Sequence, residues 1–105
     1  MLDLNEKLYE EYLAGELPVL VEFWAPWCVY CRRITVAMEQ IAKKYENRIV
    51  VARVNIDECP DLTRREHIEV VPTLVLYRGG KSVSATVAPG SAGELRRFLD
   101  EALAR

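Results

Sequence analysis

The chain has 105 residues, of which 50% are hydrophobic and 29% charged, a composition typical of a folded domain and not of a disordered chain. This length predicts a single domain over residues 1–105. Fourteen basic against 16 acidic residues give a formal net charge of −2, which argues against binding to nucleic acid or to anionic membranes. The first residues contain no basic segment followed by an apolar run, so no secretory signal is predicted and a cytoplasmic location is expected.

Hydrophobic periodicity and capping patterns predict eight elements in chain order. The first is a helix that opens with a capping-box spacing from Asp3 to Glu6, uses Leu4, Leu8, Tyr12 and Leu13 as its apolar positions, and ends at Gly15. The others are a buried strand over 18–24, a long amphipathic helix over 28–45, a strand over 49–56, a short helix over 60–67, strands over 73–77 and 82–87, and a helix over 91–103.

This order of elements predicts an α/β fold with a central mixed four-stranded sheet flanked by helices on both faces. The first two strands are joined by the long helix, so they should be parallel with a right-handed crossover. The last two strands are separated by a glycine turn, so they should form an antiparallel hairpin.

Two of the three cysteines, Cys28 and Cys31, lie where the first buried strand leads into the long helix. Residues three apart on a helix share a face, and their α-carbons are about 5 Å apart, within the range of a disulfide. The start of a helix favours an anion, which should lower the pKa of the Cys28 thiol. We therefore interpret Cys28 as the attacking nucleophile and the more buried Cys31 as the resolving thiol.

Two other interpretations of this pair are open. A Cys-X-X-Cys pair is also half of a zinc site, but Cys59 and His67 are the only further thiol and imidazole, and their spacing does not resemble a second ligand pair. The pair could also be inert and buried. Redox chemistry is favoured because the pair lies at a strand-to-helix junction of a βαβ pattern.

Residues 23–31, Phe-Trp-Ala-Pro-Trp-Cys-Val-Tyr-Cys, resemble the active-site segment of thioredoxins. Residues 55–57 and 71–73 stand at intervals similar to those of the same family, and the resemblance covers residues 5–105. It implies a thioredoxin fold whose first strand is short or missing, because few residues precede the first helix. It also implies thiol–disulfide exchange with no cofactor beyond the redox-active Cys28–Cys31 pair and no metal.

The resemblance implies roles for individual residues. Cys28 matches the nucleophile of the family and Cys31 its resolving cysteine. Pro72 matches a cis proline that faces the disulfide, an expectation that comes from the family because only about 5–6% of X–Pro bonds are cis. The residues implied in substrate binding are Trp27, Val29, Tyr30, Val71 and Pro72.

Glu22 is the only charged residue in the apolar run 18–24, where a buried carboxylate is costly. Thioredoxins usually have an aspartate here, which accepts a proton from the buried thiol. The resemblance implies the same catalytic role for Glu22, with a raised pKa. The alternative is a glutamate that reaches solvent or forms an ion pair, with Arg53 as the candidate partner.

Several features depart from the family pattern. Val29 and Tyr30 replace the usual glycine and proline, which predicts a redox potential less reducing than the value of about −270 mV for thioredoxin. Val36 replaces a common kinking proline, and residues 86–90 differ from the usual edge of the substrate groove.

Cys59, before a proline, could cap the short helix with a lowered pKa or be unreactive, and His67 is expected on the surface near a helix end.

The function implied is reduction of protein disulfides by a monomer that a thioredoxin reductase regenerates, with no nucleic-acid or membrane partner. Two alternatives are kept. One is a glutaredoxin-like or disulfide-isomerase-like exchanger, which Tyr30 suggests. The other is a non-catalytic binding module that uses only the fold.

Overall fold

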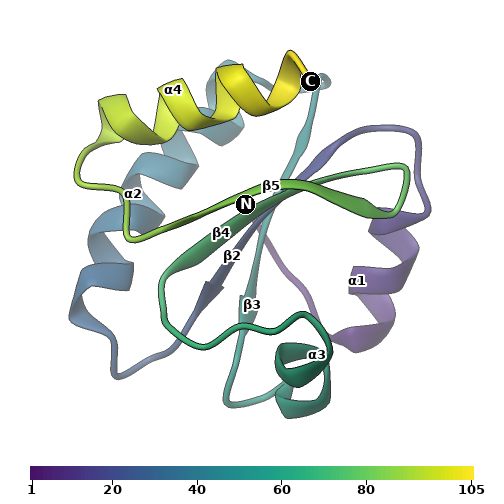
Figure 1. Ribbon diagram of the computed structural model, residues 1–105, viewed down its shortest axis with the longest axis vertical. Coiled ribbons are helices and arrows are strands. Elements are labelled where there is room, and N and C mark those ends of the chain that lie inside the picture. Colours follow the sequence, from purple (N-terminus) through teal and green to yellow (C-terminus); the bar gives the residue numbers. More distant parts are fainter.

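Five strands form one mixed sheet in the computed structural model, which describes residues 1–105 (Figure 1). Their order across the sheet is β1-β3-β2-β4-β5. The strands β1, β3 and β2 are parallel, and β4 is antiparallel to both β2 and β5. Their bounds are Leu2–Asp3 for β1, Val19–Trp24 for β2, Val50–Asn55 for β3, Thr73–Arg78 for β4 and Lys81–Val87 for β5.

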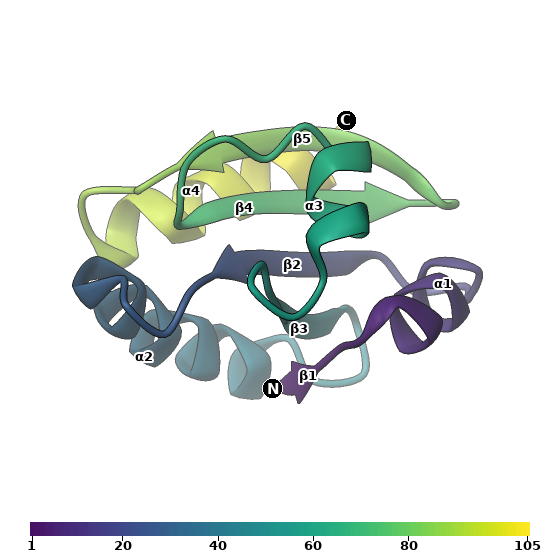
Figure 2. The ribbon, with the colours of Figure 1, turned by 90° about the horizontal axis from the view of Figure 1, so that it is seen from below.

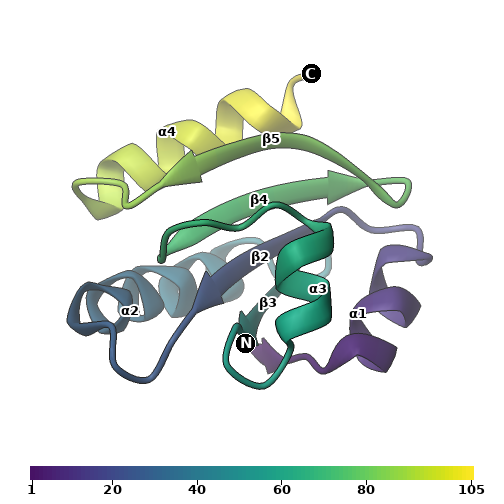
Figure 3. The same ribbon diagram turned by 60° about the horizontal axis from the view of Figure 1, so that its bottom comes forward.

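Four helices cover the two faces of this sheet (Figure 3). The helices α2 and α4 pack on one face, and α1 and α3 pack on the other. None of them combines the length and the apolar character that crossing a membrane requires. Their bounds are Glu6–Leu13 for α1, Val29–Lys44 for α2, Pro60–Arg65 for α3 and Ala92–Leu103 for α4.

The predicted mixed sheet with helices on both faces is confirmed. The four predicted strands correspond to β2, β3, β4 and β5. The additional strand, β1, is only two residues long and pairs with β3 next to the N-terminus (Figure 2). The first strand of the fold is therefore present but short. The helix α2 runs unbroken through Val36.

The prediction that Asp3 caps the first helix is wrong, because the N-cap residue of α1 is Asn5. The side chain of Asn5, not Asp3, accepts a hydrogen bond from the backbone N–H of Leu8, at 2.9 Å. Asp3 lies in the extended backbone of β1, two residues before that cap, so it cannot serve the helix. The buried positions of α1 are Tyr9 and Leu13, whereas Leu8 is exposed.

Side chains along the central strand β2 point alternately to the two faces of the sheet, and this decides which of the two cores each side chain packs in. Leu20 packs with the core under α2 and α4, while Val19, Val21 and Phe23 pack with the core under α1 and α3. Because neighbouring strand residues point to opposite faces, Glu22 shares the face of Leu20. The only fully buried charged side chain of the chain therefore points toward α2.

Candidate active site

Cys28 and Cys31 lie at the start of α2 and are joined by a disulfide, with α-carbons 5.4 Å apart. Cys28 is the N-cap residue, and its Sγ accepts a hydrogen bond from the backbone N–H of Cys31 at 3.2 Å. Cys28 is half-buried, whereas Cys31 is completely buried. In the reduced pair, the free N–H groups of the helix start favour a thiolate at the Sγ of Cys28, the less buried of the two cysteines.

The loop before β4 faces this disulfide. The Sγ of Cys28 lies 3.8 Å from the backbone carbonyl oxygen of Val71. The peptide bond between Val71 and Pro72 is cis, in agreement with the expectation from the family resemblance. Val71 is half-buried and Pro72 buried, and the backbone carbonyl of Val71 is the group of this loop that borders the sulfur of the half-buried Cys28.

The other expected substrate-contact residues, Trp27, Val29 and Tyr30, are next to the cysteines in the chain. Trp27 is 65% exposed, and its Nε1 donates a hydrogen bond to Asp57 at 3.1 Å. Val29 is 70% exposed. The hydroxyl of Tyr30 instead donates to the backbone carbonyl of Pro89 at 2.6 Å, which ties the first turn of α2 to the loop before α4. No local pattern in the sequence marks Asp57 and Pro89 as partners of these aromatic side chains, because both contacts join distant segments.

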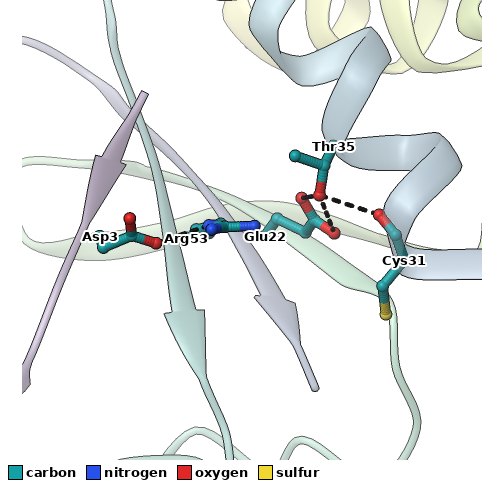
Figure 4. Close-up of polar contacts among 5 residues, drawn as sticks. All are labelled: Asp3, Glu22, Cys31, Thr35 and Arg53. Atoms are coloured by element: carbon teal, nitrogen blue, oxygen red, sulfur yellow. Dashed lines mark hydrogen bonds and ion pairs between the residues drawn. The ribbon is translucent and has the colours of Figure 1, made fainter. Parts of the chain in front are cut away.

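Glu22 lies on the side of β2 that α2 covers, with its carboxyl next to Thr35, one turn of α2 after Cys31 (Figure 4). Burial raises the pKa of this carboxyl from 4.5 to about 7, although the hydrogen bond from Thr35 and the positive charge of Arg53 both lower it. A carboxyl with this pKa is partly ionised near neutral pH, so it can either accept or release a proton there.

The alternative interpretation of Glu22 as a solvent-reaching or ion-paired residue is wrong. Its side chain has no exposed surface. Arg53, in register with Glu22 on the adjacent strand, forms its ion pair with Asp3 on the other side, with Nε 2.5 Å from Oδ1. The guanidinium of Arg53 also lies over the ring of Trp24, 4.2 Å from its centroid. The positive charge of Arg53 therefore acts on Glu22 without an ion pair or hydrogen bond between them.

Thr35 is a site residue that the sequence analysis missed. Its Oγ1 lies 3.2 Å and 3.5 Å from the two carboxyl oxygens of Glu22, and 2.9 Å from the backbone carbonyl oxygen of Cys31 (Figure 4). The available signal was its position four residues after Cys31, which places it on the same face of α2.

Cys59 behaves differently from the expectation of a helix-capping thiol with a lowered pKa. It is the N-cap residue of α3, but its side chain makes no capping hydrogen bond and is only 4% exposed. Burial raises the pKa of its thiol, and the negative charges of Glu6 and Glu58 raise it further. The interpretation of Cys59 as a capping thiol with a lowered pKa is therefore wrong, because the thiol is buried in the core and makes no capping bond; the alternative of an unreactive thiol stays a prediction.

His67 is exposed just beyond α3, with a left-handed φ of 57°, which confirms its expected surface position. Nowhere in the chain do three or more His, Cys, Asp or Glu side chains gather in an arrangement that could hold a metal ion.

The chain matches the family model described as Thioredoxin over residues 1–101. It is 41% identical over 94 residues to the thioredoxin of Synechocystis sp., and the aligned residues cover 90% of this chain and 88% of that relative. It is 38% identical to thioredoxin 1 of Nostoc sp., with the same coverage. It is also 36% identical over 97 residues to the bifunctional thioredoxin reductase/thioredoxin of Mycobacterium leprae, covering 91% of this chain and 21% of that protein. With Cys28 and Cys31 in the active-site position, the chain belongs to the thioredoxin family of dithiol–disulfide oxidoreductases.

Proposed function

We propose that this thioredoxin reduces protein disulfides, with Cys28 as the attacking thiol and Cys31 as the resolving thiol. The Cys28 thiolate attacks one sulfur of the substrate disulfide, the substrate S–S bond breaks, and a mixed disulfide forms as the first substrate thiolate leaves. The Cys31 thiolate then attacks the sulfur of Cys28 and releases the second substrate thiolate. Two electrons pass from the dithiol to the substrate, and the Cys28–Cys31 disulfide remains.

The observation that supports this division of roles is the difference in exposure within the pair. Cys28 is half-buried and borders the Val71 carbonyl, whereas Cys31 has no exposed surface. A bulky protein disulfide can reach only the first sulfur. Attack by the second is intramolecular, and the short distance between the cysteines makes that step fast.

Glu22 is proposed to accept the proton that Cys31 must lose before it attacks. The carboxyl is buried on the α2 side of β2, and its pKa of about 7 leaves a substantial ionised fraction near neutral pH. After the transfer, Glu22 holds the proton and Cys31 is a thiolate. This step needs no bound cofactor, because the electrons reside in the cysteine pair.

The substrate groove is proposed to lie between the start of α2 and the loop before β4. Trp27 and Val29 offer exposed apolar surface beside Cys28. The backbone of Val71 and Pro72 offers hydrogen-bonding groups to an extended substrate segment, as an unpaired strand edge does. Tyr30 closes one end of this groove through its contact with the loop before α4.

A thioredoxin reductase is proposed as the electron donor, which makes the chain a carrier in cellular electron transport and redox homeostasis. This proposal is supported by the similarity to a relative whose name joins the two activities in one chain. We propose that the chain works as a cytoplasmic monomer without nucleic-acid or membrane partners, in accord with its formal net charge of −2.

Coupled reduction of insulin tests the proposed function. With a bacterial thioredoxin reductase and NADPH, the chain should reduce the insulin disulfides at a rate that depends on its concentration. The matched control is Cys28→Ser, which should be inactive. Activity that requires glutathione, with none from the reductase, would instead favour a glutaredoxin-like exchanger.

The exchanger alternative also predicts a redox potential. Val29 and Tyr30 replace the usual residues between the cysteines, so we expect a potential less reducing than about −270 mV. Equilibration with a glutathione buffer, followed by quantification of the dithiol and disulfide forms, measures it. A potential at or below about −270 mV contradicts this expectation.

A further inference from the structure

Thr35 lies between the buried acid and the turn of α2 that contains Cys31 (Figure 4). Its Oγ1 is within hydrogen-bonding distance of both Glu22 carboxyl oxygens and of the Cys31 carbonyl oxygen, at 3.2, 3.5 and 2.9 Å. It is the only hydrogen-bonding partner of Glu22, which is the only fully buried charged side chain in the protein. The Thr35 hydroxyl is therefore the one group of the protein that donates a hydrogen bond to this carboxyl.

A threonine hydroxyl has a single proton, so it cannot donate to Cys31 and to Glu22 fully at the same time. When Glu22 is protonated, its own O–H can donate to Oγ1 of Thr35, and the Thr35 hydroxyl is free to donate to the Cys31 carbonyl. When Glu22 is ionised, the carboxylate can only accept, and the Thr35 hydroxyl must turn toward it. The Cys31 carbonyl then still has its helical partner, the N–H of Thr35.

We propose that Thr35 is a positioning residue whose hydroxyl follows the charge of Glu22, donating to the Cys31 carbonyl when the acid is protonated and to the carboxylate when it is ionised. The proposal rests on the proposed function, in which Glu22 takes the proton of Cys31. Only a hydroxyl hydrogen has to rotate, so a carboxylate that is shielded from water can gain and lose a charge without moving any heavy atom.

Few other groups near Glu22 could respond to a change in the charge of its carboxyl. Arg53 faces it from β3 and is held by Asp3 on β1, so its charge lowers the pKa of Glu22 without a hydrogen bond. The residue in register on β4 is the apolar Leu74, and α4 adds apolar side chains to this core. The remaining titratable group is the thiol of reduced Cys31. After burial itself, the Thr35 hydrogen bond has the largest influence on the pKa of Glu22.

The variant Thr35→Val tests the proposal because it keeps the shape of the side chain and removes the hydroxyl. We expect the titration midpoint of Glu22 to rise by about one pH unit, the effect of losing one hydrogen bond to a charged group. At pH 7 this would lower the ionised fraction about fivefold. NMR of the ¹³C-labelled Glu22 carboxyl measures the midpoint, and the pH profile of mixed-disulfide resolution should shift by the same amount. Thr35→Ser should restore both values.

The matched control is Thr63→Val. The hydroxyl of Thr63 donates to the carbonyl of Cys59 at 2.7 Å, so this variant loses the same type of bond to a cysteine one turn earlier, in a helix without a buried carboxyl. It should leave the midpoint of Glu22 and the pH profile unchanged. An equal shift in the two valine variants would overturn the proposal, because the effect would then be structural.

The variant Glu22→Gln distinguishes the role of Glu22 as proton acceptor from the role of Thr35. If it abolishes the inflection in the pH profile while Thr35→Val leaves the carboxyl midpoint unchanged, the proposal for Thr35 is wrong and the role of Glu22 stands. If the inflection persists in Glu22→Gln, the proton-accepting role of Glu22 is wrong, and the proposal that depends on it is overturned as well.

Discussion

Two helices of this protein begin with a cysteine, and only one of these cysteines is in a position to react. Cys28 is the N-cap residue of α2, and Cys59 is the N-cap residue of α3. Each helix also has a threonine whose hydroxyl bonds to a cysteine carbonyl one turn earlier, Thr35 to Cys31 and Thr63 to Cys59. The local designs are similar, so the difference in chemistry must come from the surroundings.

The surroundings differ in exposure and in charge. Cys28 is half-buried and accepts a hydrogen bond from a helix N–H, which stabilises a thiolate. Cys59 is 4% exposed, makes no capping bond, and has its pKa raised by burial and by Glu6 and Glu58. A helix start therefore does not by itself activate a cysteine. The thiol must also be reachable and must accept the N–H groups that the helix offers.

Replacement of the two N-cap cysteines should separate their roles most strongly. Cys28→Ser should lower the rate of insulin reduction at least about a thousandfold, because no other sulfur can form the mixed disulfide. Cys59→Ser should retain most of the activity. Comparable losses in both variants, with both proteins folded by circular dichroism, would show that Cys59 takes part in the reaction.

No buried acid lies beside Cys59, whereas the helix that carries Cys28 and Cys31 packs over the buried carboxyl of Glu22. This carboxyl should lower the stability of the folded protein at neutral pH. The folded-state pKa of Glu22 is raised from 4.5 to about 7, so the native state retains a proton that the unfolded chain has lost. Stability therefore falls as pH rises through this window, and the penalty is complete above it, at about 3 kcal/mol.

Glu22→Gln removes this penalty, so the variant should be more stable than the parent by up to about 3 kcal/mol at pH 8 and should lose this advantage near pH 4. Urea unfolding of the oxidised protein at both pH values measures the difference. Cys59→Ala is the control. Burial raises the pKa of the Cys59 thiol, so the thiol does not titrate between these two pH values and its removal should not change how stability depends on pH. A Glu22→Gln variant with no pH-dependent gain in stability would contradict the raised pKa.

Alkylation of the reduced protein compares the two thiols directly. The start of α2 favours the thiolate of Cys28, whereas burial and the negative charges of Glu6 and Glu58 raise the pKa of the Cys59 thiol. Because the thiolate is the form that reacts, iodoacetamide should label Cys28 at least about tenfold faster than Cys59. Peptide mass spectrometry over time gives both rates, and equal rates would remove the distinction drawn between the two helix starts.

Sequence patterns predicted four of the five strands, the four helices and the redox pair, because these depend on local periodicity and on close spacing along the chain. Glu22 was also identifiable, as the single charge within a buried strand. Thr35 was not, because its contact with Glu22 depends on how α2 packs over β2. The burial of Cys59 and the ion pair of Asp3 with Arg53 likewise depend on contacts between distant segments.

The division of roles, in which Cys28 attacks and Cys31 resolves, is best tested by trapping with Cys31→Ser. Without the resolving thiol, attack on a protein disulfide should stop at a stable mixed disulfide, which nonreducing gels and mass spectrometry can locate. We expect nearly all trapped substrate to be bonded to Cys28, and none to be trapped when Cys28 is also replaced by serine. Substrate bonded mainly to Cys59, or no trapped species at all, would contradict it.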